Sequence, residues 1–107
     1  MIAYTVTAEF ASPELVDRYI AWLSGGHVKA VCDGGAASAE VVRLDGVSGE
    51  PLTVSVRYQF PDRGTLEAYF TEHAPRLRAE GLALFGPGSG VTFTRSTGVV
   101  VHRETKR

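Results

Sequence analysis

The strict alternation of apolar and polar residues in LTVSVRYQF, residues 52–60, is the feature that most constrains how this chain can fold. Leucine, valine, tyrosine and phenylalanine occupy every second position, and the positions between them carry threonine, serine, arginine and glutamine. Successive side chains of a β-strand point to opposite faces of its sheet, so a period of two residues predicts a strand with one apolar face. That face must be covered by another part of the chain.

The neighbouring strands follow from the same kind of pattern. Residues 2–10 alternate like residues 52–60, and further strands are expected at about 37–44 and 91–101. A polar loop joins the strand at 37–44 to the strand at 52–60 as a hairpin.

Helical spacing of apolar residues fills the two long intervals between these strands. The first helix is expected to begin at Ser12–Pro13 and to stop at Gly25–Gly26, with a short helix after it. Asp62 and Thr65 compete as the cap of the helix that follows residues 52–60. The order β-α-(short α)-β-β-α-β predicts a ferredoxin-like α+β sandwich, in which a four-stranded antiparallel sheet carries its helices on one face.

The last helical region contains a proline in mid-run, in the stretch EHAPRLR at residues 72–78. Pro75 cannot donate a backbone hydrogen bond to the carbonyl of Thr71, so the helix should break near His73 and restart at Pro75. Residues at helical spacing predict an apolar stripe through this region, made of Leu66, Phe70, His73, Leu77 and Leu84.

Length and composition restrict the class of protein. A chain of 107 residues is expected to form one domain over residues 1–102, with residues 103–107 as a frayed tail. The net charge of −1 and the absence of a basic face argue against nucleic acid as a partner, and no apolar run approaches the roughly 20 residues of a membrane helix. Cys32 is the single cysteine, which excludes an internal disulfide and favours a reducing cytoplasm.

The sheet face away from the helices is predicted to be bare and lined by small side chains. Its residues are Ala3, Thr5, Thr7, Thr53, Ser55, Arg57, Gln59, Thr92 and Thr94. A solvated sheet face more often carries lysine and glutamate. We therefore expect this face to pack against a second copy of the chain, as a homodimer, although a simple exposed sheet is the alternative.

Three segments together carry a resemblance to a known family. They are MIAYTVT at the start, W-x4-H at Trp22 and His27, and EHAPRLR followed by FG between Glu72 and Gly86. The chain resembles a family of short bacterial proteins of unknown function within the dimeric α+β barrel superfamily, over nearly its full length. The resemblance implies a homodimer whose two sheets face each other, with a pocket in each subunit between helices and sheet.

That superfamily includes cofactor-independent monooxygenases, lactone isomerases, haem-degrading enzymes and stress-response proteins without known catalysis. Because such different activities share one fold, the resemblance does not fix the function. It also transfers no catalytic residues, since none is established for the nearer family.

Two histidines and several aromatic residues are the candidates for a site. Histidine exchanges protons near neutral pH, so His27 and His73 are the candidate acid/base groups. The candidate ligand-binding residues, which could line one aromatic cavity with these histidines, are Tyr4, Trp22, Tyr58 and Tyr69. The alternative is that both histidines only pack or cap, and that the aromatic residues only form the core.

No motif indicates a metal or a cofactor. The cysteine and the three histidines lack the spacing of zinc sites, and haem held by one histidine is suggested only by analogy with the superfamily. We expect a non-catalytic module that binds a small ligand or mediates dimeric interactions. The alternative is a small cofactor-independent enzyme, of the monooxygenase or isomerase type, that acts on an aromatic or polyketide-like molecule through a histidine.

Overall fold

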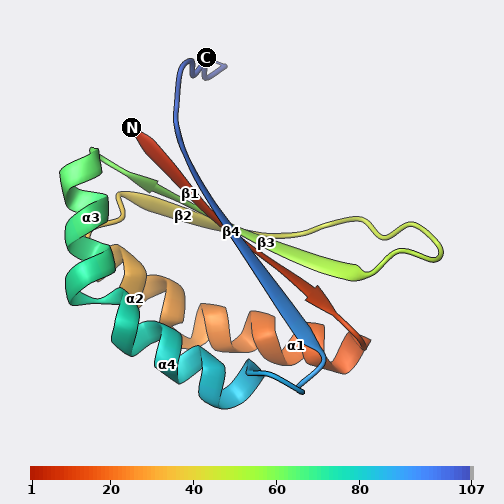
Figure 1. The fold of residues 1–107 in the computed structure, drawn as a ribbon. Helices are drawn as coiled ribbons and strands as arrows, with labels where there is room; N and C mark the ends of the chain where they lie inside the picture. Colours follow the sequence, from red (N-terminus) through yellow and green to blue (C-terminus); the bar gives the residue numbers. More distant parts are fainter. Residues whose placement is uncertain (107) are drawn as a thin grey trace.

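A computed structural model describes residues 1–106 and forms one antiparallel sheet with all helices on the same side (Figure 1). The elements are β1 (Ile2–Phe10), α1 (Pro13–Trp22), the π-helical turn η1 (Leu23–His27), α2 (Val28–Asp33), β2 (Ser38–Arg43), β3 (Leu52–Phe60), α3 (Arg63–Glu72), α4 (Ala74–Phe85) and β4 (Val91–Val99). The sheet has four strands in the order β2-β3-β1-β4. The predicted ferredoxin-like α+β fold is therefore confirmed.

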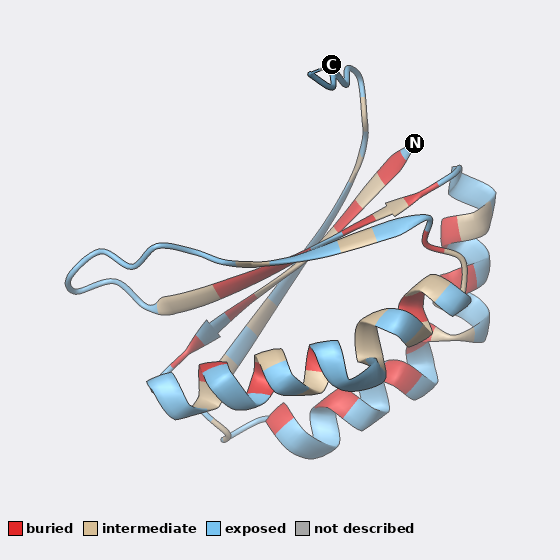
Figure 2. Ribbon diagram, turned by 180° about the vertical axis from the view of Figure 1, so that it is seen from behind, coloured by how far each residue is buried: buried red, intermediate tan, exposed pale blue. Residues whose placement is uncertain are grey.

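The register of the sheet decides which side chains face the helices. Tyr4 of β1 pairs with Tyr58 of β3, and Val6 lies between Val56 on one side and Arg95 on the other. The residues of β3 that face the helices are almost completely buried from Val54 to Phe60, as the alternating pattern predicts, and Leu52 at the start of the strand is half-buried. Figure 2 shows the buried positions of the helices turned toward the sheet.

The first helical region is interrupted at its second glycine, as predicted. Helix α1 and the turn η1 lead up to Gly26, whose backbone is not helical, and the short helix α2 follows it. Gly26 has φ 148°, which a residue with a Cβ atom rarely adopts. The predicted stop and the predicted short helix after it are both present, and because only one glycine departs from helical geometry the interruption takes the form of a sharp bend.

The second helical region breaks where the proline predicts. Helix α3 ends at Glu72, His73 has φ −121°, and α4 starts at Ala74 with Pro75 in its first turn. Of the two competing caps, Asp62 is the N-cap of α3, and its Oδ1 accepts a hydrogen bond from the Thr65 amide at 2.7 Å.

The break also changes which residues of this region are buried. The buried apolar residues are Leu66, Tyr69, Ala74, Leu77 and Phe85. Phe70 is half-buried and packs against the core as predicted, whereas Leu84 is 48% exposed, so the predicted stripe is wrong at Leu84. Because α4 starts afresh at the break, its helical phase is no longer that of α3, and Phe85 rather than Leu84 faces the sheet.

The other face of the sheet has no helix over it (Figure 1). Thr5 and Thr7 are half-buried there, Thr92 and Thr94 are exposed, and Ser55 is buried between its neighbours. Residues 100–106 have no regular secondary structure, and the last residue of the expected frayed tail, Arg107, lies outside the described residues.

Candidate functional site

A pocket lies between the helices and the sheet, where α1, η1 and α4 meet the middle of β1. Val6 marks its floor: it points to the helix side from the centre of the sheet, yet it is only partly buried. The cavity measures about 50 Å³. One buried water needs about 10–15 Å³ of such space, whereas an engineered cavity that takes benzene measures about 150 Å³. A ring-sized ligand must therefore displace side chains, and the exposed residues of the lining, Leu82 and Arg78 among them, are the ones with solvent beside them.

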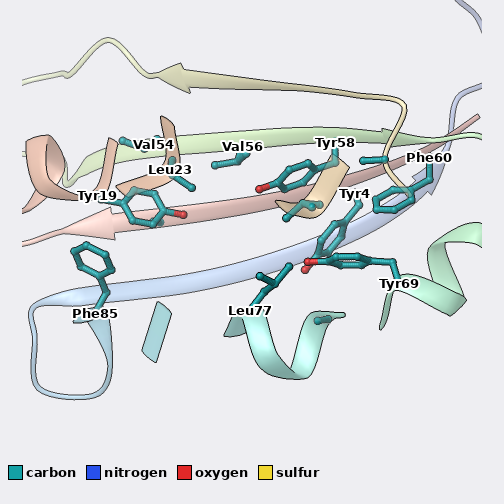
Figure 3. Close-up of a cluster of buried hydrophobic side chains, with 14 of the residues drawn as sticks. Tyr4, Tyr19, Leu23, Val54, Val56, Tyr58, Phe60, Tyr69, Leu77 and Phe85 are labelled. Atoms are coloured by element: carbon teal, nitrogen blue, oxygen red, sulfur yellow. The ribbon is translucent and has the colours of Figure 1, made fainter. Parts of the chain in front are cut away.

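All four tyrosines of the chain line this pocket. Figure 3 shows the hydroxyls of Tyr4, Tyr19, Tyr58 and Tyr69 turned toward the space above Leu77. Tyr4 stacks on Tyr58 with ring centroids 5.8 Å apart. The Tyr4 hydroxyl accepts a long hydrogen bond of 3.4 Å from Arg78 Nη2. Within residues 1–106, the hydroxyls of Tyr19, Tyr58 and Tyr69 have no hydrogen-bond partner.

Burial keeps these phenols protonated. It raises the pKa of Tyr19 and of Tyr69 to about 12, and it also raises the pKa of Tyr58. A phenol that holds its proton donates a hydrogen bond. The tyrosine wall therefore presents hydrogen-bond donors to whatever occupies the pocket.

His27 and Trp22 form the opposite wall. Their rings stack with centroids 4.0 Å apart and planes at 22°, because the kink at Gly26 turns His27 back over the last residue of α1. His27 Nδ1 is buried and has no hydrogen-bond partner among the described residues. Burial lowers the pKa of His27, against the opposing charge of Glu80, so the imidazole is neutral near pH 7 and able to accept a proton.

Gly81 brings α4 close to this stack. A Cβ atom at Gly81 would lie 3.1 Å from Cη2 of Trp22, which is closer than ordinary packing allows. Glycine inside a helix costs about 1 kcal/mol relative to alanine. Its presence in α4 is explained by the indole ring that lies against it.

His73 does not line this pocket, so its predicted place beside His27 is wrong. The break between α3 and α4 turns its ring toward the end of α2, where a Cβ atom at Gly34 would lie only 3.0 Å from His73 Cγ. The ring also stacks on Tyr69, with centroids 6.3 Å apart. The other candidate residues, Tyr4, Trp22, His27, Tyr58 and Tyr69, are brought together as predicted, although their role in binding is untested.

The pocket also contains residues that the sequence did not single out. They include Tyr19, Arg78 and Arg95. The alternation of β4 carries the signal for Arg95: Val91 and Phe93 face the helices, so Arg95, two residues further, faces them as well. An arginine on the apolar side of a strand marks the edge of a core or a site.

A second hollow, of about 420 Å³, lies on the open face of the sheet. It is lined by polar side chains that have partners: Arg57 lies 3.9 Å from Glu40, and Arg103 Nη1 donates to Gln59 Oε1 at 3.1 Å. Apart from Tyr58 it has no aromatic lining. The inner pocket, with its unpartnered polar atoms, is the better candidate site.

Neither a metal site nor a membrane span is found in residues 1–106. No group of three or more His, Cys, Asp and Glu side chains is placed there to hold a metal ion. No helix in the same range has the length and apolar character to cross a bilayer.

Solved structures share this fold at low sequence identity. A dimeric ferredoxin-like protein from an uncultured marine organism is 21% identical, with a TM-score of 0.69 over 96% of this chain and 97% of that one. A putative antibiotic biosynthesis monooxygenase from Deinococcus radiodurans is 12% identical, with a TM-score of 0.68 over 100% and 99% of the two chains.

A monooxygenase from the gene ActVA-Orf6 of Streptomyces coelicolor, solved with the ligand nanaomycin D, is 15% identical, with a TM-score of 0.66 over 97% and 92% of the chains. At these identities the likeness concerns the fold alone. No curated protein matches the chain significantly. The profile of one family, described as Domain of unknown function (DUF4286), matches residues 1–98, and the chain belongs to this family.

Proposed function

We propose that this protein is a homodimeric module that binds a small, planar aromatic molecule in the pocket between its helices and its sheet. The observation that carries the proposal is a buried polar atom without a hydrogen-bond partner, Nδ1 of His27, in an aromatic pocket that the hydroxyl-bearing rings of Tyr19, Tyr58 and Tyr69 also line. A polar group that is removed from water without a hydrogen bond costs about 1–3 kcal/mol. A ligand that carries oxygen atoms on a ring system would satisfy these groups and stack on the aromatic walls.

Binding is tested by isothermal titration calorimetry with 2-naphthol, a planar ring system with one hydroxyl. We expect saturable binding of one molecule per subunit, weakened at least several-fold in Tyr58→Phe and His27→Phe. His102→Phe is the matched control, because His102 is exposed in the C-terminal segment and lies outside the pocket. Absence of saturable binding by the wild-type protein at millimolar 2-naphthol, or equal binding by all variants, would contradict the proposal.

The dimer is proposed to form through the open face of the sheet. Support comes from the small side chains of that face and from solved structures of similar fold that are described as dimeric. In sedimentation at micromolar concentration we expect a dimer for the wild-type protein. Thr7→Lys, in the middle of the open face, should give a monomer, whereas Glu67→Lys on the exposed side of α3 should not. A wild-type monomer would refute this part of the proposal.

One observation favours an enzyme as the second candidate. His27 is neutral, its Nδ1 is unpartnered, and it lies in the pocket, which are the conditions for a base that removes a proton from a bound molecule. Proton removal is a step that isomerases and cofactor-independent oxygenases share. Two proteins of similar fold are described as monooxygenases, one of them as putative.

The enzyme candidate is tested without oxygen, by exchange of a carbon-bound proton. Anthrone has an acidic methylene group, and its exchange with D₂O is followed by NMR under argon. If His27 acts as a base, the wild-type protein accelerates the exchange and His27→Gln does not. Acceleration that persists in His27→Gln, or no acceleration by the wild-type protein, would leave the binding module as the function.

A further inference from the structure

We propose that the pocket is selective for anions, and that its ligand is an aromatic carboxylate or an equally acidic aromatic compound held by Arg78 and Arg95. This inference rests on the proposed binding function and specifies the chemical class of the ligand. It derives from the charges around the pocket rather than from its shape.

Arg78 and Arg95 reach the pocket from different elements. Arg78, on α4, donates to the Tyr4 hydroxyl at 3.4 Å, and its guanidinium carbon lies 5.5 Å from the centroid of Phe70. Arg95, on β4, pairs with Val6 across the sheet and lies 5.8 Å from the centroid of Phe93. Both guanidinium groups therefore rest on aromatic rings and line the pocket.

Neither arginine has a carboxylate partner within residues 1–106. The ion pairs found there are Lys29–Asp33, Arg43–Asp17, Arg57–Glu40 and His102–Glu104. Arg43 and Arg57 show that other arginines of this chain do find carboxylates. Arg78 and Arg95 are instead placed where a charge from outside the chain can reach them.

The lining of the pocket contains no aspartate or glutamate. Glu80, whose charge partly offsets the lowering of the pKa of His27, does not itself line the pocket. Besides His27, the remaining polar groups are tyrosine hydroxyls, which are protonated near pH 7 and can donate hydrogen bonds. A site with two cationic groups and several neutral donors complements a ligand that supplies acceptors and negative charge.

The test compares ligands that share one ring system and differ in charge. Calorimetric titrations of the full chain use 2-naphthoate, 2-naphthamide and 2-naphthylmethylammonium in low-salt buffer. We expect 2-naphthoate to bind about 5–10-fold more tightly than 2-naphthamide, which corresponds to the difference between a charge-assisted and a neutral hydrogen bond. The cationic ligand should bind most weakly of the three.

Variants then assign the preference to the arginines. Arg78→Gln and Arg95→Gln should each reduce the preference for 2-naphthoate, and the double variant should remove it while 2-naphthamide still binds. Arg76→Gln is the control, because Arg76 lies on α4, is exposed and is outside the pocket. Thermal melts followed by circular dichroism establish that each variant is folded.

The outcomes separate this inference from the function on which it rests. Equal affinity for 2-naphthoate and 2-naphthamide would overturn anion selectivity and leave the aromatic pocket in place. A preference that survives in the double variant would overturn the assignment to Arg78 and Arg95. If none of the three ligands binds at millimolar concentration, both the binding function and the selectivity are contradicted.

Discussion

Both interruptions of the helical layer carry a histidine, but they place it in opposite ways. At the first, Gly26 has φ 148° and the next residue, His27, turns back over Trp22 into the pocket. At the second, His73 itself occupies the break before Pro75, and its ring packs against Gly34 and Tyr69 outside the pocket. A helix break therefore does not by itself create a functional position. The backbone geometry on each side of the break decides whether the side chain enters a cavity or fills a joint between helices.

The largest loss of stability is expected where His73 packs against Gly34 and Tyr69, at the contact between α2 and the α3–α4 break. Gly34→Val would place its Cβ atom 3.0 Å from His73 Cγ and 3.1 Å from Tyr69 Cδ1, so both rings would have to shift. Overpacking of this kind costs about 1–3 kcal/mol of the free energy of unfolding, measured by urea denaturation. Gly25→Val is the matched control for added volume, because nothing lies within 4 Å of a Cβ atom at that position. Equal losses in the two variants would show that the His73 joint is not tightly packed.

A smaller loss is expected at the bend that positions His27. Gly26→Ala has free space around its Cβ atom, so its cost comes from the positive φ alone. We expect a loss of about 1–2 kcal/mol in urea denaturation, together with weaker binding of 2-naphthol, since the bend holds His27 over Trp22. Gly25→Ala, at a neighbouring glycine without a positive φ, should change neither quantity by a comparable amount. If Gly26→Ala is destabilised but binds 2-naphthol as tightly as the wild-type protein, the bend is not required for ligand binding.

The smallest effect concerns the dependence of stability on pH. Burial lowers the pKa of His27 from its ordinary value of 6.5. As pH falls below 6.5, the unfolded chain takes up a proton at this residue before the folded chain does, so acidification favours unfolding. The contribution of His27 to the free energy of unfolding is fully present above pH 6.5 and is lost as the pH falls toward the lowered pKa of the folded state. His27→Gln should therefore lose less stability than the wild-type protein between pH 7 and pH 5, as measured by urea midpoints, and parallel curves would contradict the role of burial.

The sequence predicted most of the fold because its strongest signals are local. The alternation of residues 52–60 matches β3 residue for residue, and the proline at position 75 predicts the break at His73. What local patterns could not supply is the helical phase after an interruption. The burial of Phe85 instead of Leu84 and the position of His73 both depend on how α4 restarts, which is decided by packing against α2 and the sheet.

The candidate site was predictable in part for the same reason. Tyr4 and Tyr58 lie on predicted strand faces, and the register of β1 and β3 places them side by side. Arg95 could have been found from the alternation of β4, whereas Arg78 required knowledge of the direction of α4. The interruption at Gly26 was predictable because glycine readily adopts a positive φ at helix ends, whereas the stacking of His27 on Trp22 that follows from it was not.

The stack of Trp22 on His27 has a practical consequence. Trp22 is the single tryptophan of the chain, so the intrinsic indole fluorescence of the protein comes entirely from one wall of the pocket. Its ring is half-buried, touches the imidazole at a centroid distance of 4.0 Å and lies against Gly81. Emission intensity and wavelength should therefore report occupancy of the pocket and protonation of His27 without any label. Trp22 is therefore an intrinsic fluorescent probe of the candidate site.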